Sequence, residues 1–292
     1  MDEIKIKRDR SEFWVNVYSL DDGGVSIITS PKFQYLFQNK FAQLEALSPT
    51  KWKDTKTGSN KSLWIPSDWL DEQTLEQFIE WAKKANNHLW LGVNKNICNY
   101  FSNQLDYCIA SDWNFTDFTS HIRSNVGEAE YMVKYQYADG LITLEQAKAY
   151  GKALSIEVEK CIEYLPITNI GELLITTIPA VKENQNKLSW NMARYIHNQI
   201  GGSFLAPMLL IDKPQMKELT IEQKINTWKS IYASCNNISL SCSVSGKDII
   251  IVDDLYQSGA TIWAYANYLK KQGARMVMGL TAVKSLRDSD NK

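Results

Sequence analysis

Hydrophobic runs and polar breaks alternate in the last part of the chain. "DIIIVDD" (248–254) is a continuous apolar run, and it predicts a buried strand that ends in two acids. "QSGATIWAYANYLKKQG" (257–273) has small residues followed by helical spacing, which predicts a turn and a helix that stops at a glycine. "RMVMGLTAV" (275–283) predicts one more strand. Strand, helix and strand in this order are typical of a parallel sheet covered by helices.

The same alternation begins further upstream. Residues 172–178, "ELLITTI", predict a buried strand, and residues 189–200 predict a helix that stops at Gly201. Residues 203–247 show a more irregular pattern. Together these segments predict the βαβ order of a parallel sheet with flanking helices.

Residues 143–165 predict a long amphipathic helix. Thr143 and Gln146 have the spacing of a capping box. The apolar residues recur on one face, which we interpret as a packing surface. They are Leu144, Ala147, Gly151, Leu154, Val158, Cys161 and Leu165.

The N-terminal part has a different texture. Its pattern predicts a hairpin at 13–29 around "DDGG", helices at 31–47 and 67–85, a polar loop at 48–62 and a short strand at 88–93. Seven of the ten tryptophans lie in the first 113 residues. They are consistent with a small core of large side chains, which we favour, or with an aromatic interaction surface.

These patterns predict two domains in the 292 residues. Residues 1–122 form a smaller α+β region of unassigned role, which is a candidate for binding a protein partner. Residues 123–292 form an α/β domain. A homodimer is the default expectation for an α/β enzyme of this kind.

Composition excludes several classes of protein. The formal net charge of −1 gives no overall field that favours nucleic acid or a membrane surface. The five cysteines form no CxxC pair and the three histidines are far apart, so neither a zinc site nor a disulfide framework is expected. The chain shows no apolar leader and no long apolar run, which predicts a cytoplasmic protein without a membrane span.

The two acids at the end of the 248–254 strand need an explanation, since a buried charge is costly without a partner. Ligands of doubly wound sheets bind at the carboxyl ends of strands, where Asp253 and Asp254 are expected. Directly afterwards, the backbone N–H groups and hydroxyls of "QSGAT" would form an anion site at a helix N-terminus. A phosphate site beside two carboxylates predicts a sugar phosphate, with the acids accepting hydrogen bonds from vicinal ribose hydroxyls.

"IIIVDDLYQSGAT" (249–261) resembles the 5-phosphoribosyl 1-diphosphate (PRPP) signature of type I phosphoribosyltransferases. Three further segments are similar to the ComF-like branch of that superfamily, although its four-cysteine zinc module is missing. "GEAEYMVKYQYADG" (127–140) resembles the helix before the transferase core, and "KPQMKELTIEQKINTWKSIY" (213–232) the segment before the signature. "TTIPAVKENQN" (176–186) lies where the family has its diphosphate loop. The resemblance covers about residues 124–287 and implies a type I phosphoribosyltransferase-like parallel sheet.

The resemblance also implies roles for single residues. Asp253 and Asp254 would hold the ribose hydroxyls, and Mg²⁺ would bridge diphosphate and ribose oxygens near them. Lys182 would face the diphosphate, and Tyr256 is a candidate for lining the pocket. The 5-phosphate would bind to Gln257, Ser258, Gly259, Ala260 and Thr261. An acid is usual at position 257 in purine-salvage relatives, so Gln257 disfavours a 6-oxopurine acceptor.

Other residues keep two interpretations each. Lys213 and Lys217 are either solvated loop residues or contacts to diphosphate or acceptor. Trp190 and Trp263 are either packing residues, which we favour, or stacking surfaces for a base. His197 is interpreted as a helix-face residue.

Two functions are consistent with these motifs. One is a Mg²⁺-dependent phosphoribosyltransferase that acts on PRPP and an unidentified base or amine. The other is a non-catalytic PRPP sensor or an accessory effector of a bacterial conflict system, for example a retron used in antiviral defence, or of a competence system.

Overall fold

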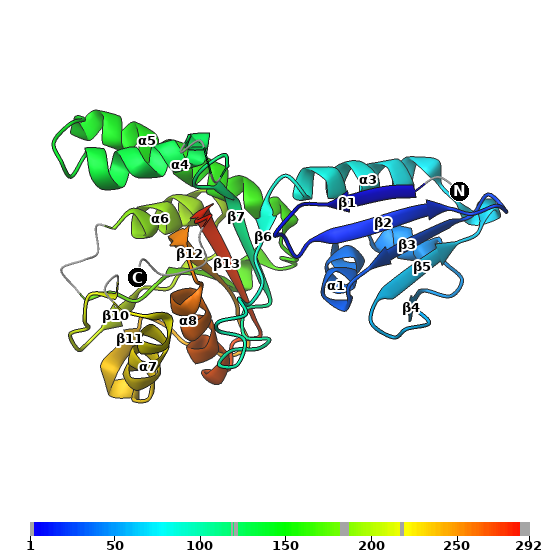
Figure 1. The fold of residues 1–292 in the computed structure, drawn as a ribbon. Coiled ribbons are helices and arrows are strands. Elements are labelled where there is room, and N and C mark those ends of the chain that lie inside the picture. The colour runs from blue at the N-terminus through cyan, green and yellow to red at the C-terminus, as the bar shows by residue number, and fades with distance from the viewer. Residues whose placement is uncertain (1–2, 118, 120–121, 182–186, 217–218, 287–292) are drawn as a thin grey trace. The chain divides into compact units, whose positions relative to one another are not determined.

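The computed structural model describes two compact units. Unit 1 contains residues 1–90 and 164–168, and unit 2 contains residues 91–163 and 169–292. The described residues are 3–117, 119, 122–181, 187–216 and 219–286 (Figure 1).

Unit 1 is an α+β structure built on a five-stranded antiparallel sheet with the order β1-β2-β3-β5-β4. The predicted hairpin is confirmed as β2 and β3, and Gly23 supplies a positive φ of 79° in the turn. The strands of unit 1 are β1 (Glu3–Lys7), β2 (Trp14–Ser19), β3 (Val25–Thr29), β4 (Trp52–Asp54), β5 (Lys61–Ile65) and β6 (Leu89–Trp90). Its helices are α1 (Pro31–Lys40), α2 (Ala42–Ala46), η1 (Ser67–Trp69) and α3 (Glu72–Ala85).

Aromatic rings fill the core of unit 1. Phe13 stacks on Trp90 with ring centroids 5.3 Å apart, and Phe37 meets Phe78 edge to face at 5.0 Å. The core interpretation of the tryptophans therefore holds for Trp90. In contrast, Trp64 and Trp69 of the "WIPSDWL" cluster are exposed.

Two predictions for unit 1 are wrong in detail. The expected loop at 48–62 contains β4, an edge strand that pairs with β5, and its polar character reflects its exposure. The helix expected over 31–47 is broken at Phe41, whose φ of −134° is not helical.

Unit 2 is an α/β structure with a parallel sheet, as the sequence predicts. Its strands follow the order β7-β13-β12-β8-β9, and every neighbouring pair is parallel. These strands are β7 (Tyr107–Trp113), β8 (Leu173–Thr177), β9 (Ser203–Phe204), β12 (Asp248–Tyr256) and β13 (Met276–Lys284). A separate antiparallel pair is formed by β10 (Pro207–Leu209) and β11 (Ile238–Leu240).

The sequence pattern did not reveal β7. The predicted domain division after residue 122 assigns β7 to the N-terminal region, whereas this strand pairs with β13 along the sheet of unit 2. The compact units accordingly divide between Trp90 and Leu91.

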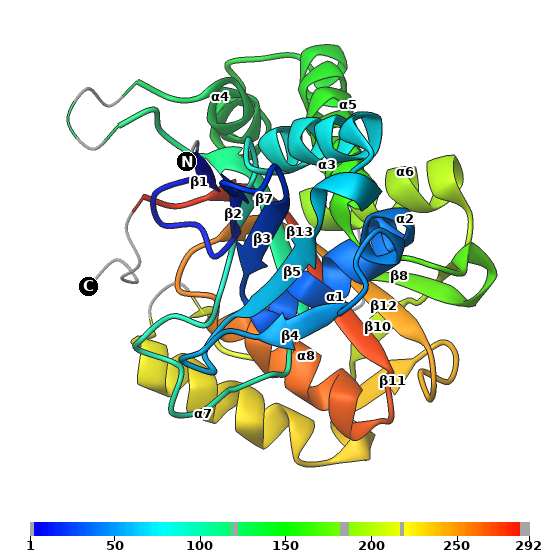
Figure 2. The ribbon, with the colours of Figure 1, turned by 90° about the vertical axis from the view of Figure 1, so that its right-hand side faces the viewer.

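Helices cover the sheet of unit 2 (Figures 1 and 2). The irregular stretch expected at 203–247 in fact contains α7, whose capping box of Thr220 and Gln223 marks its start. The helices of unit 2 are α4 (Asn125–Tyr131), the π-helix η2 (Met132–Gln136), α5 (Leu144–Lys160), η3 (Cys161–Tyr164), η4 (Ile170–Glu172), α6 (Leu188–Ile200), α7 (Ile221–Tyr232), η7 (Cys235–Asn237) and α8 (Ala260–Lys271). Within the described ranges, no helix has both the length and the apolar character needed to cross a bilayer.

The strand order creates a switch point between β8 and β12. From β8 the chain passes through α6 to β9 on one side, and from β12 it passes through α8 to β13 on the other. Right-handed crossovers in opposite directions place α6 and α8 on opposite faces of the sheet. The carboxyl ends of β8 and β12 therefore border the crevice in which doubly wound sheets bind ligands.

Candidate functional site

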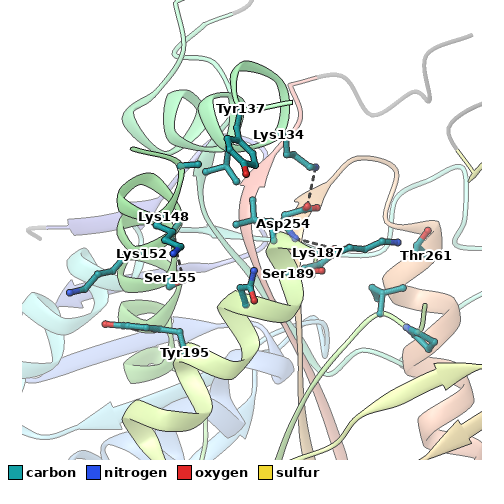
Figure 3. A pocket seen from close by; sticks show the side chains of 18 of the residues that line it. Lys134, Tyr137, Lys148, Lys152, Ser155, Lys187, Ser189, Tyr195, Asp254 and Thr261 are labelled. Atoms are coloured by element: carbon teal, nitrogen blue, oxygen red, sulfur yellow. Dashed lines mark hydrogen bonds and ion pairs between the residues drawn. The ribbon is translucent and has the colours of Figure 1, made fainter. Parts of the chain in front are cut away.

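A cavity of about 1110 Å³ lies at the carboxyl ends of β8 and β12. Asp253 and Asp254 from the end of β12 line it, together with Thr261 from the first turn of α8. Ile178 and Pro179, which follow β8, line it as well. The switch point of unit 2 is therefore hollow, and both predicted acids line the cavity. Figure 3 shows Asp254 there.

The loop between β12 and α8 has the shape of an anion site. Gly259 is the N-cap residue of α8 and adopts the left-handed conformation, with φ of 84°. No side chain caps the helix there, apart from a long contact of 3.5 Å between the Ala260 N–H and Ser258 Oγ. Gly259 and Ala260 are buried, and of residues 257–261 only Thr261 belongs to the described cavity lining. The Thr261 hydroxyl accepts a hydrogen bond of 3.2 Å from Trp228 Nε1 and lines the cavity.

The Tyr256 side chain packs against Gly259 and supports this loop. Its side chain is buried, its hydroxyl donates to the Gly92 carbonyl at 3.0 Å, and Trp263 Nε1 donates to the same hydroxyl at 3.0 Å. A Cβ on Gly259 would lie 2.3 Å from the Tyr256 hydroxyl oxygen, so only glycine fits there. Tyr256 thus holds the loop in place, and the described cavity lining does not include it.

Gln257 and Ser258 lie at the base of the loop. The buried Lys284 side chain donates to the Gln257 carbonyl at 3.1 Å and to the Ser285 carbonyl at 2.9 Å. Ser258 is also buried. These contacts fix the backbone that precedes Gly259.

An ion-pair cluster connects the acid pair to α4 and η2. Lys134 Nζ lies 3.0 Å from an Asp254 carboxylate oxygen and 3.0 Å from Glu130 Oε1 (Figure 3). Glu130 is buried. Burial opposes the charge on Lys134, yet the two carboxylates outweigh it and raise the pKa of this amine above its ordinary value.

Asp253 carries the most perturbed carboxyl of the site. Burial, and secondarily the charge of Asp254, raise its pKa to about 7, while Lys134 and the N–H of Asp254 work in the opposite direction. That N–H donates to Asp253 Oδ1 at 3.0 Å. A buried carboxylate is costly without partners, and hydrogen bonds from sugar hydroxyls would stabilise its ionised form.

Lysines dominate the remaining lining. Besides Lys134, the described lining includes Lys148 and Lys152 of α5, Lys187 before α6, and Lys213. Burial and the charge of Lys187 lower the pKa of Lys213, whose amine lies 5.3 Å from the centre of the Trp228 ring. Five lysines and two aspartates make this cavity cationic although the whole chain has a net charge of −1.

Trp190, Trp263 and His197 are not among the described residues that line the cavity. Trp190 packs edge to face on Phe204 at 4.9 Å, and Trp263 is buried against Tyr256. His197 lies on α6 outside the described cavity lining. Lys182 and Lys217 fall outside the described residues.

Sequence reasoning missed two parts of the site. The stripe on α5, interpreted as packing, divides in two: Leu154 and Val158 are buried, whereas Leu144 and Gly151 line the cavity. Lys148 and Lys152 lie on the same side of α5, and their spacing of four residues was an available signal. The ion pair between Lys134 and Asp254 joins distant segments and had no signal in the pattern.

The acid pair suits a hard cation. Carboxylate oxygens are the ligands that Mg²⁺ prefers, and this ion usually takes its remaining ligands from water and substrate phosphates. In the described part of the chain, no cluster of three or more His, Cys, Asp or Glu residues forms a metal cage. The role of Asp253 and Asp254 beside Mg²⁺ stays a prediction.

Solved structures of two phosphoribosyltransferases and of a phosphoribosylpyrophosphate synthetase are similar to part of this chain. A hypoxanthine phosphoribosyltransferase from Staphylococcus aureus is 14% identical, with a TM-score of 0.28 over 46% of this chain and 60% of that one. A hypoxanthine-guanine phosphoribosyltransferase from Bacillus anthracis is 17% identical, with a TM-score of 0.28 over 49% of this chain and 70% of that one. A phosphoribosylpyrophosphate synthetase from Mycobacterium smegmatis is 14% identical, with a TM-score of 0.25 over 47% and 32% of the two chains.

The matched region spans less than two thirds of the Staphylococcus and Mycobacterium chains. No protein-family model matches the sequence, and no curated protein matches it. The predicted fold class of α/β with a parallel sheet and flanking helices is confirmed by the strand pairing of unit 2. The assignment to the ComF-like branch stays a prediction.

Proposed function

We propose that unit 2 binds PRPP with Mg²⁺ and transfers its phosphoribosyl group to a nitrogen of a base or amine. One observation carries this proposal: the acid pair Asp253–Asp254 and Thr261 in the first turn of α8 line the same cavity at the switch point of the sheet. An anion site next to paired carboxylates matches a phosphate and the vicinal hydroxyls of one ribose.

The bound sugar would be held at both ends. Backbone N–H groups at Gly259 to Thr261 would donate to the 5-phosphate, aided by the dipole of α8. Asp253 and Asp254 would accept from the 2- and 3-hydroxyls of the ribose. Lys187 is the N-cap residue of α6 and lines the cavity. Its amine supports a diphosphate position near the start of α6.

Transfer needs few reacting groups from the protein. The C1–O bond to diphosphate breaks, the diphosphate leaves with the electron pair, and a nitrogen lone pair of the acceptor forms the new bond to C1. The proton of that nitrogen passes to solvent or to a nearby base. Orientation of the sugar and neutralisation of the leaving group by lysines are the main contributions of these residues. Mg²⁺ bound to the diphosphate would add charge neutralisation to the same group.

A PRPP sensor is the alternative, and the ion pair between Lys134 and Asp254 favours it. A sugar that engages Asp254 competes with Lys134, so binding would change the contacts of η2. In this alternative, the change would be transmitted to a partner protein, for which unit 1 is a candidate surface.

Titration calorimetry with PRPP and Mg²⁺ tests the proposal. The wild-type protein should bind with a 1:1 stoichiometry, and Asp254→Asn should weaken binding by about tenfold or more, since a carboxylate is a stronger acceptor than an amide. Asp139→Asn is the matched control, because Asp139 is an exposed acid of the same unit outside the described lining. Equal affinities of both variants, or no binding by the wild type, would refute the proposal.

Diphosphate release distinguishes enzyme from sensor. The same protein is incubated with PRPP, Mg²⁺ and a panel of bases and amines. Release that depends on an acceptor identifies a transferase. Saturable PRPP binding without release supports the sensor.

A further inference from the structure

One face of α5 forms a wall of the cavity that the proposed PRPP site does not use. Its residues follow helical spacing, since Leu144, Lys148, Gly151, Lys152 and Ser155 recur every three or four positions. In Figure 3, Lys148 and Lys152 lie on one side of Asp254, and Thr261 and Lys187 lie on the other. The cavity therefore continues beyond the acid pair, away from the phosphate loop.

The spacing of Lys148 and Lys152 on this wall has a small cost in helix stability. Like charges four residues apart on a helix repel each other by a few tenths of a kcal/mol. Among the described residues, neither Lys148 nor Lys152 belongs to an ion pair, whereas Lys160 on the same helix pairs with Glu157 at 2.7 Å. A positive charge concentrated in a concave site attracts an anionic ligand.

Gly151 keeps the space between these lysines open. Its φ is not in the left-handed region, and an added Cβ would meet only a Leu188 methyl at 3.9 Å. Neither backbone conformation nor packing therefore requires glycine here, although glycine within a helix costs about 1 kcal/mol relative to alanine. Open volume for a ligand is a physical reason for its presence.

Helix α6 supplies polar and aromatic groups to the lining. Tyr195 and Asn191 of α6 line the cavity one helical turn apart, and Tyr195 lies on the same side of Asp254 as Lys148 and Lys152 in the view of Figure 3. A volume of about 1110 Å³ exceeds the range of roughly 300–1000 Å³ typical for one small-molecule ligand. The cavity has room for a second molecule beside a sugar phosphate.

We propose that the surface formed by Lys148, Gly151, Lys152 and Tyr195 is a second subsite, which binds an aromatic acceptor through an acidic group on that acceptor. This inference rests on the proposed function, because it takes the sugar to occupy the acid pair and the phosphate loop. The acidic group, a carboxylate or a phosphate, binds Lys148 and Lys152, and the ring packs against Tyr195. Neutral bases lack the group that these lysines recognise.

Binding of matched aromatic probes tests the subsite without requiring turnover. The protein is first saturated with ribose 5-phosphate and Mg²⁺, so that the sugar site is filled. Benzoate is compared with benzamide, and phenyl phosphate with phenol, by ligand-observed NMR titration. We expect the acidic member of at least one pair to bind about tenfold tighter than its neutral partner, as one or two charge-assisted hydrogen bonds provide. The pair that shows the preference identifies a carboxylate or a phosphate.

Variants locate the preference on α5. Lys148→Gln combined with Lys152→Gln should abolish it, and Gly151→Leu should block all four probes by filling the space. Lys160→Gln, on the same helix but outside the described lining, should leave probe binding unchanged. A preference that persists in the double variant, equal binding within both pairs, or no binding of any probe would overturn the subsite.

A parallel PRPP titration separates this inference from the proposed function. If the wild type does not bind PRPP, the proposed function fails. If PRPP binds and the Lys148→Gln/Lys152→Gln variant loses PRPP affinity as strongly as Asp254→Asn, the lysines hold the diphosphate, and only the second subsite is refuted. Unchanged PRPP affinity together with lost probe preference supports both.

Discussion

At the scale of single residues, Gly259 and Asp253 set the properties of the site. Gly259 provides the left-handed turn at which α8 begins. Asp253 is a carboxyl that burial and a neighbouring charge keep close to its protonated form. Each property can be changed by one substitution.

Gly259→Ala should destabilise the protein more than a matched glycine substitution. Gly246 has a similar φ of 72° and nothing within 4 Å of an added Cβ, so Gly246→Ala carries only the backbone penalty of about 1–2 kcal/mol. Gly259→Ala adds the overlap with Tyr256 and should cost about 2 kcal/mol more. Urea denaturation measures both, and equal losses would contradict the role of Tyr256 as support for the loop.

Asp253 should make stability depend on pH. Its pKa is raised from 3.8 in an unfolded chain to about 7 in the folded protein. Between these values the folded state holds a proton that the unfolded state has released, so the free energy of unfolding falls as pH rises toward 7. Asp253→Asn removes this charge and should raise Tm by a few degrees at about pH 8, with little change near pH 4. Thermal unfolding curves that keep the wild-type pH dependence would contradict this assignment.

At the scale of elements, the segment from α4 to η2 is tied to the end of β12 by charge. Lys134 bridges Glu130 and Asp254, and the side chain of Glu130 is only 5% exposed. Loss of the central cation leaves a buried carboxylate without a partner, which is more costly than the loss of a surface pair.

Lys134→Met should therefore cost about 2–3 kcal/mol of folding free energy. Adding Glu130→Gln should recover part of that loss, because the buried charge is removed as well. Lys160→Met is the control, since Lys160 and Glu157 form an exposed pair worth less than about 1 kcal/mol. Chemical denaturation compares the three variants, and similar losses for Lys134→Met and Lys160→Met would show that the cluster is not a structural tie.

Local sequence patterns predicted some elements of this chain and missed others. The strand with Asp253 and Asp254, the helix ending at Gly201 and the capping box of α5 are predicted, because each has a local signal in spacing or turn chemistry. β7 was missed because its apolar run is short and its partner β13 lies far away in sequence. The α7 helix was missed although its capping box at Thr220 was readable. Periodicity identified the apolar face of α5 but could not say that half of it borders a cavity.

At the scale of the whole molecule, the net charge of the chain does not reveal the positive electrostatic field of the cavity. The formal charge of −1 gave no overall field that favours nucleic acid or a membrane surface, yet the described cavity lining contains five lysines and two aspartates. Segments far apart in sequence supply these residues, from η2, α5, the start of α6 and the end of β12. The fold, rather than composition, creates the cationic site at the switch point of the sheet.

The central claim is that one cavity holds a sugar by its hydroxyls and its phosphate. A crystal structure with ribose 5-phosphate and Mg²⁺ tests this claim most directly. We predict the phosphate within hydrogen-bonding distance of the backbone N–H groups at Gly259 to Thr261, with the 2- and 3-hydroxyls on Asp253 and Asp254. A sugar bound elsewhere, or an acid pair that remains engaged only with Lys134 at saturating ligand, would contradict it.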